Sequence, residues 1–246
     1  MIRYVLIPVL ISFLVTVFLL PFWIRKARDL GLLWDDMNKF GKPKIAGSGG
    51  IIAILGFLIG LLVFIAYRTF FLNSEEFLVE ILAISTSVLF LASIGFIDDL
   101  MGWKKGGLRR RHRIILTGLA AIPLMAINAG KSTILVPLVG AVDFGLIYPL
   151  IFIPIGVIGA STTYNFLAGF NGIEAGNGII IFIALSIVSY YTGNSWLSIV
   201  SLCMAGALLA FLLFNRYPSK VFPGDALTYS VGGLIAIISI IGNFEK

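Results

Sequence analysis

The chain has 246 residues, of which 59% are hydrophobic and 12% are charged, and its mean hydropathy is +1.04. In soluble domains about one quarter of the residues are charged. The composition of this chain therefore excludes a water-soluble fold and predicts an integral membrane protein. A single cysteine, Cys203, excludes a disulfide within the chain and a thiolate metal cluster. The net charge of +6 suits anionic partners such as phosphate groups, although basic loops also orient ordinary membrane proteins.

The apolar segments, taken in chain order, predict an all-α polytopic membrane protein with about eight transmembrane helices in one domain, 1–246. A helix needs about 20 apolar residues to cross the hydrocarbon core. We expect spans at residues 2–24, 49–67, 77–97, 114–130, 145–160, 177–192, 196–214 and 226–243. The fifth and sixth are short and rich in Gly and Pro, so we expect one of them to be broken or tilted. Residues 132–143 alternate weakly and predict a short hairpin.

Four polar loops lie on one face if each apolar segment crosses the membrane once. These loops are residues 25–48, 98–113, 161–176 and 215–225, and they hold fourteen of the eighteen Lys and Arg residues. Because basic loops stay in the cytosol, the charge pattern predicts that this polar face is cytosolic and that both termini are extracytosolic.

Two adjacent acids, Asp98 and Asp99, follow the third apolar run. They are either a solvated flank that stops the helix, or a carboxylate pair that shares a divalent ion such as Mg²⁺ or supplies a base. The basic stretch 104–113 comes next. Its basic residues either orient the chain in the membrane and attract anionic lipid, or they hold a pyrophosphate and its metal beside the acids. His112 is the only histidine, which excludes a three-histidine zinc site.

Three further segments suit a ligand. Residues 165–178 (NFLAGFNGIEAGNG) form either an ordinary loop or one whose backbone N–H groups and Asn amides bind a ligand, a base edge or a cation. In residues 222–225 (FPGD), Asp225 is either a helix N-cap or a metal ligand. Residues 47–50 (GSGG) lack P-loop spacing, but such a helix start can bind an anion through free N–H groups.

Together, these segments resemble the polyprenyl-phosphate N-acetylhexosamine-1-phosphate transferase family. The matching motifs, in family order, are KPKIAGSGGI (42–51), FIDDL (96–100), RRRHRIIL (109–116), YNFLAGFNGIEAG (164–176) and FPGD (222–225). The fourth motif is most similar to that of the eukaryotic and archaeal-type UDP-GlcNAc:dolichyl-phosphate GlcNAc-1-phosphotransferases. The related bacterial phospho-MurNAc-pentapeptide translocases carry Asp at the places of Ala168 and Asn171.

The resemblance implies a reaction at the cytosolic membrane face. N-acetylhexosamine-1-phosphate, GlcNAc-1-phosphate in particular, passes from a UDP-sugar to a polyprenyl or dolichyl phosphate, and UMP is released. The implied cofactor is Mg²⁺, or Mn²⁺ in its place, held by Asn165 and Asp225. The implied catalytic residues are Asp98, Asp99, Arg113, which replaces the usual Lys, and Lys44. The implied substrate-binding residues are Asn171, Gly172, Glu174, Ser48, Arg111 and His112.

The resemblance also implies partners and a location. The expected partners are the UDP-N-acetylhexosamine, the polyprenyl or dolichyl phosphate, membrane lipids and a second copy of the chain, with no nucleic acid. The expected location is a plasma membrane or an ER-type membrane. The family usually has ten spans, so we expect its last two helices and its sugar-contacting loop to be missing after Lys246. Two alternatives stay open: an ion or solute transporter, and a non-catalytic relative that binds lipid phosphate.

Overall fold

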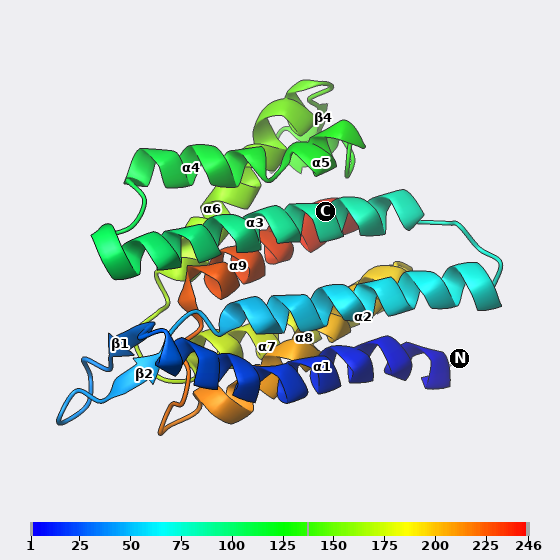
Figure 1. The fold of residues 1–246 in the computed structure, drawn as a ribbon. Helices are drawn as coiled ribbons and strands as arrows, with labels where there is room; N and C mark the ends of the chain where they lie inside the picture. Colours follow the sequence, from blue (N-terminus) through cyan, green and yellow to red (C-terminus); the bar gives the residue numbers. More distant parts are fainter. Residues whose placement is uncertain (1, 137, 245–246) are drawn as a thin grey trace.

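The computed structural model describes residues 2–136 and 138–244, and it is a helical bundle with two short hairpins (Figure 1). The helices are α1 (Ile2–Asp29), α2 (Gly50–Phe71), α3 (Leu78–Lys105), α4 (Arg110–Leu119), α5 (Ile122–Ala126), the π-helical turn η1 (Tyr148–Phe152), α6 (Ile153–Asn165), α7 (Ile173–Tyr191), α8 (Ser195–Asn215) and α9 (Gly224–Gly242). The strands are β1 (Leu33–Asp35), β2 (Lys44–Ala46), β3 (Thr133–Val136) and β4 (Gly140–Asp143). Antiparallel pairing of β3 with β4 confirms the predicted hairpin, whereas the β1–β2 hairpin was not predicted.

Within the described residues, six helices are long and apolar enough to cross a membrane: α1, α2, α3, α7, α8 and α9. They correspond to six of the eight predicted spans, so a polytopic, mostly helical membrane protein is confirmed. The count of eight is not confirmed, because the predicted fourth and fifth spans are each in two pieces. The fourth turns at residues 120–121, before Pro123 in α5, and the fifth begins with η1, which carries Pro149 and precedes Pro154. Proline lacks the N–H that an unbroken helix requires, which accounts for an interrupted helical ladder there.

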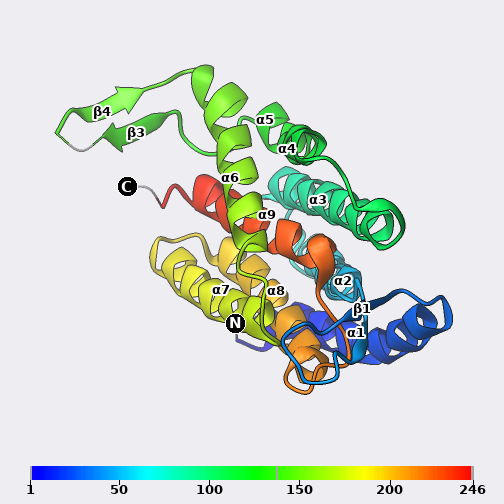
Figure 2. The same cartoon turned by 90° about the vertical axis from the view of Figure 1, so that its left-hand side faces the viewer.

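Helix α9 lies at the centre of the bundle, where it packs against α3, α6 and α2 (Figure 2). Helix α1 packs against α2 and α8, and α7 packs against α8. Small residues permit the closest approach: a Cβ atom at Gly60 of α2 would lie 1.8 Å from Ser12 Oγ of α1. Such contacts matter in a membrane, because lipid removes the hydrophobic drive for helices to associate and leaves packing to hold them together.

The polar connections gather at the end of the bundle that carries β1 and β2 (Figure 1). The segment before α9 is held there by backbone hydrogen bonds, since Phe222 N donates to Ala46 O over 2.8 Å and Gly50 N donates to Pro223 O over 2.9 Å. These bonds fix the start of α9 against β2 and the start of α2. They thereby determine where Asp225 enters the bundle.

Candidate active site

Asp98 and Asp99 lie within α3, about two turns before its end at Lys105. Their exposed fractions are only 1% and 8%. The interpretation of the pair as a solvated flank that stops the helix is therefore wrong. Because burying a carboxylate is costly unless it is paired or hydrogen-bonded, the partners of these two acids indicate what each one does.

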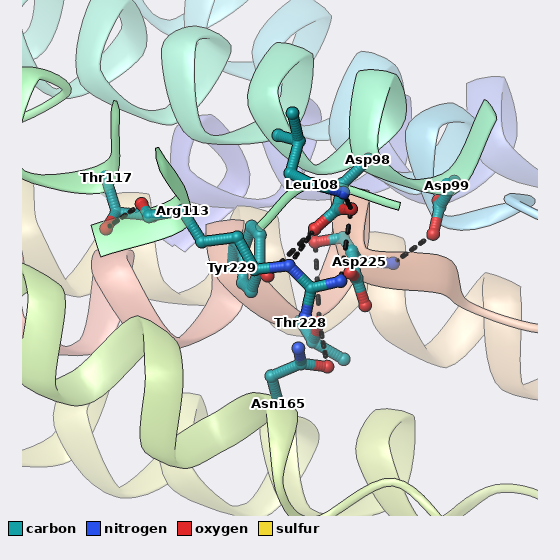
Figure 3. A network of polar contacts seen from close by, with 9 residues as sticks. All are labelled: Asp98, Asp99, Leu108, Arg113, Thr117, Asn165, Asp225, Thr228 and Tyr229. Atoms are coloured by element: carbon teal, nitrogen blue, oxygen red, sulfur yellow. Dashed lines mark hydrogen bonds and ion pairs between the residues drawn. The ribbon is translucent and has the colours of Figure 1, made fainter. Parts of the chain in front are cut away.

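Both oxygens of Asp98 are engaged by protein groups (Figure 3). Arg113 approaches in a fork: its Nε lies 2.6 Å from Asp98 Oδ2, and its Nη2 donates to Oδ1 over 3.1 Å. Leu108 N donates to Oδ1 over 2.7 Å, and the Tyr229 hydroxyl donates to Oδ2 over 3.3 Å. A two-pronged guanidinium–carboxylate contact fixes orientation as well as charge. Asp98 therefore holds Arg113 in a defined position.

Asp99 turns toward the start of α9. Its Oδ1 accepts the backbone N–H of Asp225 over 2.8 Å, and within the described residues its buried Oδ2 has no hydrogen-bond partner. Gly224 makes this approach possible: its φ is +69°, and a Cβ atom there would lie 2.2 Å from Asp99 Oδ2. The glycine of the FPGD motif is thus required both by its backbone angle and by the space it leaves.

Asp225 does not cap its helix. The N-cap position of α9 belongs to Pro223, and no side chain makes a cap hydrogen bond there. The Asp225 carboxylate instead lies beside Asp98 and Asn165 (Figure 3). Asn165, at the end of α6, accepts a hydrogen bond from Thr228 Oγ1 to its Oδ1 over 3.1 Å. Helices α3, α4, α6 and α9 therefore bring their polar ends to one place.

A cavity of about 360 Å³ adjoins this cluster. Its volume falls within the range of small-molecule sites. Its walls come from the β1–β2 hairpin, the loop between α6 and α7, and the segment that leads into α9. The polar residues that line it are Asp35, Asp36, Asn38, Ser48, Asp99, Asn165, Asn171, Glu174, Asn215, Asp225 and Thr228.

The oxygen donors at this cluster suit a hard cation. Asp225 offers a carboxylate, Asn165 an amide oxygen, and Asp99 a carboxylate oxygen without a protein partner. Among residues 2–136 and 138–244, no group of three or more His, Cys, Asp or Glu is arranged as a complete metal cage. Mg²⁺ does not need one, because it usually binds one or two carboxylates and completes its shell with waters and substrate phosphates.

Comparison with known proteins decides the family. Residues 81–243 match the model of Glycosyl transferase family 4. The chain belongs to this family. The stretch that matches runs from α3 to the end of α9 and therefore includes the acids, Arg113, Asn165 and Asp225. The family resemblance predicted from the five motifs is confirmed.

Curated relatives of this family align along nearly the whole chain. A protein of Saccharolobus solfataricus, named "Putative UDP-N-acetylglucosamine--dolichyl-phosphate N-acetylglucosaminephosphotransferase", is 35% identical over 240 residues, which are 97% of this chain and 71% of the relative. The phospho-N-acetylmuramoyl-pentapeptide-transferase of Halalkalibacterium halodurans is 32% identical over 256 residues, 99% of this chain and 76% of the relative. The UDP-N-acetylglucosamine--dolichyl-phosphate N-acetylglucosaminephosphotransferase of Dictyostelium discoideum is 29% identical over 271 residues, 95% of this chain and 65% of the relative.

The structure brings most of the predicted site residues of this family member together. Those that line the cavity are Ser48, Asp99, Asn165, Asn171, Glu174 and Asp225, and those beside it are Asp98, Arg113 and Gly172. Lys44, Arg111 and His112 are exposed and do not line the cavity. Their roles remain predictions.

Contacts within the protein occupy much of one possible anion site. The glycine-rich start of α2 was expected to offer free N–H groups, but the N–H groups of Gly47, Gly49 and Gly50 donate to Leu32 O, Phe222 O and Pro223 O. These bonds attach the start of α2 and the residues before it to Leu32, which precedes β1, and to the segment before α9, so the glycines serve close packing there.

Sequence reasoning missed four residues that shape the site. They are Asp36, Asn38, Asn215 and Tyr229. Asp36 is a charged residue next to Asp35 in a polar loop, but the residues around it did not indicate a partner 135 residues away. Asn215 is the first residue of a polar loop and Tyr229 lies in an apolar segment, and at neither position does the sequence distinguish one role for a polar side chain from another.

Proposed function

We propose that this chain transfers N-acetylhexosamine-1-phosphate, GlcNAc-1-phosphate in particular, from a UDP-sugar to a polyprenyl or dolichyl phosphate and releases UMP. Family membership and the relatives' names support this reaction. The observation that carries it is the meeting of Asp98, Asp99, Arg113, Asn165 and Asp225 beside a cavity at one end of the apolar helices. A water-soluble donor and a lipid-bound acceptor can meet only at such an interface.

The reaction transfers one phosphoryl group. An oxygen of the lipid phosphate attacks the β-phosphorus of the UDP-sugar and forms a new P–O bond. The bond from that phosphorus to the bridging oxygen breaks, and its electron pair leaves with UMP. A phosphate monoester is already largely dianionic at neutral pH, so positioning and neutralisation of charge are the main demands.

Arg113 and the acids of α3 fit those demands. Because both Asp98 oxygens are occupied by Arg113, Leu108 N and Tyr229, Asp98 acts as an orienting carboxylate. It directs the half-buried Arg113 guanidinium, which neutralises phosphate oxygens. Asp99, with one oxygen unpartnered and its side chain at the cavity wall, lies against the reacting phosphates. Lys44, Arg111 and His112 are proposed to bind phosphate from the exposed rim.

Asp225 and Asn165 would hold Mg²⁺, or Mn²⁺ in its place. The ion, when bound, neutralises the diphosphate of the donor. Asn165 Oδ1 has two lone pairs, of which one accepts the Thr228 hydroxyl. Within residues 2–136 and 138–244 no second donor to this oxygen is seen, and the other lone pair would bind the cation. The donor's nucleotide part would occupy the cavity, where Ser48, Asn171 and Glu174 line the wall and Gly172 adjoins them, with Asn171 against the uridine.

We propose eight membrane crossings. The C-termini of α3 and α6 both lie at the polar end of the bundle (Figure 1). Between these two helices the chain must therefore cross to the other end and come back. The paired pieces α4–α5 and η1–α6 supply those two crossings. With the basic loops in the cytosol, both termini are extracytosolic, in a plasma membrane or an ER-type membrane. Two copies of the chain are proposed to associate.

The test of the proposed function is UMP release from UDP-GlcNAc by purified protein, with polyprenyl phosphate and Mg²⁺. The wild type should release UMP only when lipid phosphate is present. Asp225→Ala should lower the rate by about 100-fold or more, because it removes a group that stabilises transferred charge. A folded wild type that binds UDP-GlcNAc without turnover would favour the non-catalytic alternative, and gradient-driven uptake without UMP would favour a transporter.

A further inference from the structure

Asp36 and Asn171 meet at the cavity wall although 135 residues separate them. Asn171 Nδ2 donates to Asp36 Oδ2 over 3.2 Å, and Asp36 is 5% exposed. An ionised carboxylate can only accept hydrogen bonds, so the side of the amide that faces it must be the NH₂ group. Turning the amide over would set its carbonyl oxygen against a carboxylate oxygen. Asp36 therefore determines which way round the Asn171 amide stands.

Contacts within the fold hold both residues in place without a ligand. Asp36 N donates to Pro43 O over 3.0 Å, and Lys39 N donates to Asp36 O over 3.1 Å, which closes the turn that carries the acid. On the other side, Gly172 N donates to the buried Asn215 Oδ1 over 3.0 Å and anchors the residue after Asn171. The orientation of the amide is thus a property of the protein before substrate binds.

A second bond joins the same two segments. Asn38 Nδ2 donates to Gly169 O, two residues before Asn171. Asp36 and Asn38 therefore fasten the turn of the β1–β2 hairpin to the loop between α6 and α7 at neighbouring points. Such paired attachment limits the rotation of the Asn171 side chain relative to the cavity.

We propose that Asp36 is a positioning residue that makes the nucleotide site select uracil over cytosine. This inference rests on the proposed function, in which Asn171 lies against the uridine. Uracil presents an N3–H donor beside carbonyl acceptors, whereas cytosine presents an N3 acceptor beside an amino donor. With its NH₂ group turned to Asp36, Asn171 offers its carbonyl oxygen to the base. That oxygen accepts uracil N3–H but meets a lone pair at cytosine N3, and the flip that would suit cytosine is opposed by Asp36.

Asp36→Asn tests the proposal with little change of shape. The new amide can either accept from or donate to Asn171, so the contact survives while the orientation is no longer fixed. We expect the ratio of UMP to CMP affinity to fall up to about tenfold, which corresponds to the contribution of one hydrogen bond. Asp36→Asn should raise the KM for UDP-GlcNAc more than it lowers kcat, because Asp36 acts on the nucleotide-binding side chain Asn171. A merely structural role would lower stability and kcat instead.

The affinities are measured by calorimetry with UMP and CMP on purified protein, without lipid acceptor. Asp35→Asn is the matched control: it removes the same charge from the same cavity wall, and in the described residues Asp35 makes no hydrogen bond to Asn171. It should keep the wild-type ratio, whereas Asn171→Ala should lose it. The proposal is overturned if wild type does not prefer UMP, if folded Asp36→Asn keeps the full preference, or if Asp35→Asn lowers it equally. Selective UMP binding without any lipid product would contradict the proposed function alone and leave this inference standing.

Discussion

The backbone N–H of Asp225 donates to Asp99 Oδ1 over 2.8 Å, which joins the start of α9 to the last turns of α3 across 126 residues. Gly224 lies between these two residues in space and leaves no room for a side chain. The contact places the Asp225 carboxylate beside Asp98 and Asn165 (Figure 3). Two acids that the sequence separates widely therefore belong to one site.

Gly224→Ala should disrupt this site. The added Cβ would lie 2.2 Å from Asp99 Oδ2, and the backbone at φ +69° disfavours any residue with a Cβ. We expect UMP release to fall about 100-fold as Asp99 and Asp225 are pushed apart. The control is Gly159→Ala on α6, where a Cβ would meet no atom of the described residues within 4 Å. Equal rates for the two variants would show that the Asp99–Asp225 contact is not required.

Arg113→Ala should destabilise the protein as well as inactivate it. It leaves the 1%-exposed Asp98 without its ion-pair partner, although Tyr229 and Leu108 N still donate to it. We expect a loss of about 2–3 kcal/mol in the free energy of unfolding in detergent, below the full cost of breaking a buried pair because Arg113 is partly exposed.

A second substitution separates stability from activity. Asp98→Asn combined with Arg113→Ala should recover most of the lost stability, because no unpaired buried charge remains, but it should stay inactive. Arg113→Lys should keep measurable activity, since the charge survives while the fork to Asp98 is lost. Full activity of the double variant would contradict the role of Arg113.

Thr228→Val should weaken metal binding without touching the metal ligands. The Thr228 hydroxyl donates to Asn165 Oδ1 over 3.1 Å and so orients the amide oxygen. Loss of such a supporting bond typically costs about 10–100-fold in metal affinity. Binding of Mn²⁺, followed by electron paramagnetic resonance, measures this directly. Thr192→Val at the end of α7 is the control, because its hydroxyl bonds only to the backbone of its own helix and to Asn194 in the described residues. Unchanged Mn²⁺ affinity in Thr228→Val would argue against Asn165 as a ligand.

Asn215→Ala should loosen the loop that carries Asn171. The buried Asn215 accepts from Gly172 N and donates to Val221 O over 2.8 Å. Its removal takes away the acceptor of Gly172 N and leaves Val221 O with the Ser219 hydroxyl as its donor. We expect a loss of about 2 kcal/mol in stability and a higher KM for UDP-GlcNAc. Thermal unfolding and steady-state kinetics measure the two effects. A stable variant with an unchanged KM would show that the loop is held by other contacts.

The sequence predicted the elements of this site better than their contacts. Six apolar runs coincide with six helices because a lipid-facing segment must be both apolar and helical. The motifs also identified Asp98, Asp99, Asn165 and Asp225, which the fold brings together. The fourth span was predicted as a single helix because hydropathy does not register the backbone break that occurs near Pro123. A break in the fifth or sixth span was expected from its Gly and Pro residues, and the π-helical turn at Pro149 interrupts the fifth.

The contacts that were not predicted join segments far apart in the chain. Asp36 reaches Asn171 only because β1 and β2 pair and carry their turn to the loop after α6. Residues in so short a hairpin give little periodic signal. The same hairpin leaves Lys44 exposed at the first position of β2 and outside the cavity wall, although its motif resembled a phosphate site.

The most direct test of the central claim follows the β-phosphorus of the donor. Purified protein is given UDP-GlcNAc radiolabelled at the β-phosphorus, together with polyprenyl phosphate and Mg²⁺, and lipid and aqueous products are separated. The proposed reaction predicts that the label enters the lipid fraction together with GlcNAc, while UMP remains unlabelled in water. Label left in the aqueous phase as UDP, with GlcNAc alone on the lipid, would contradict it.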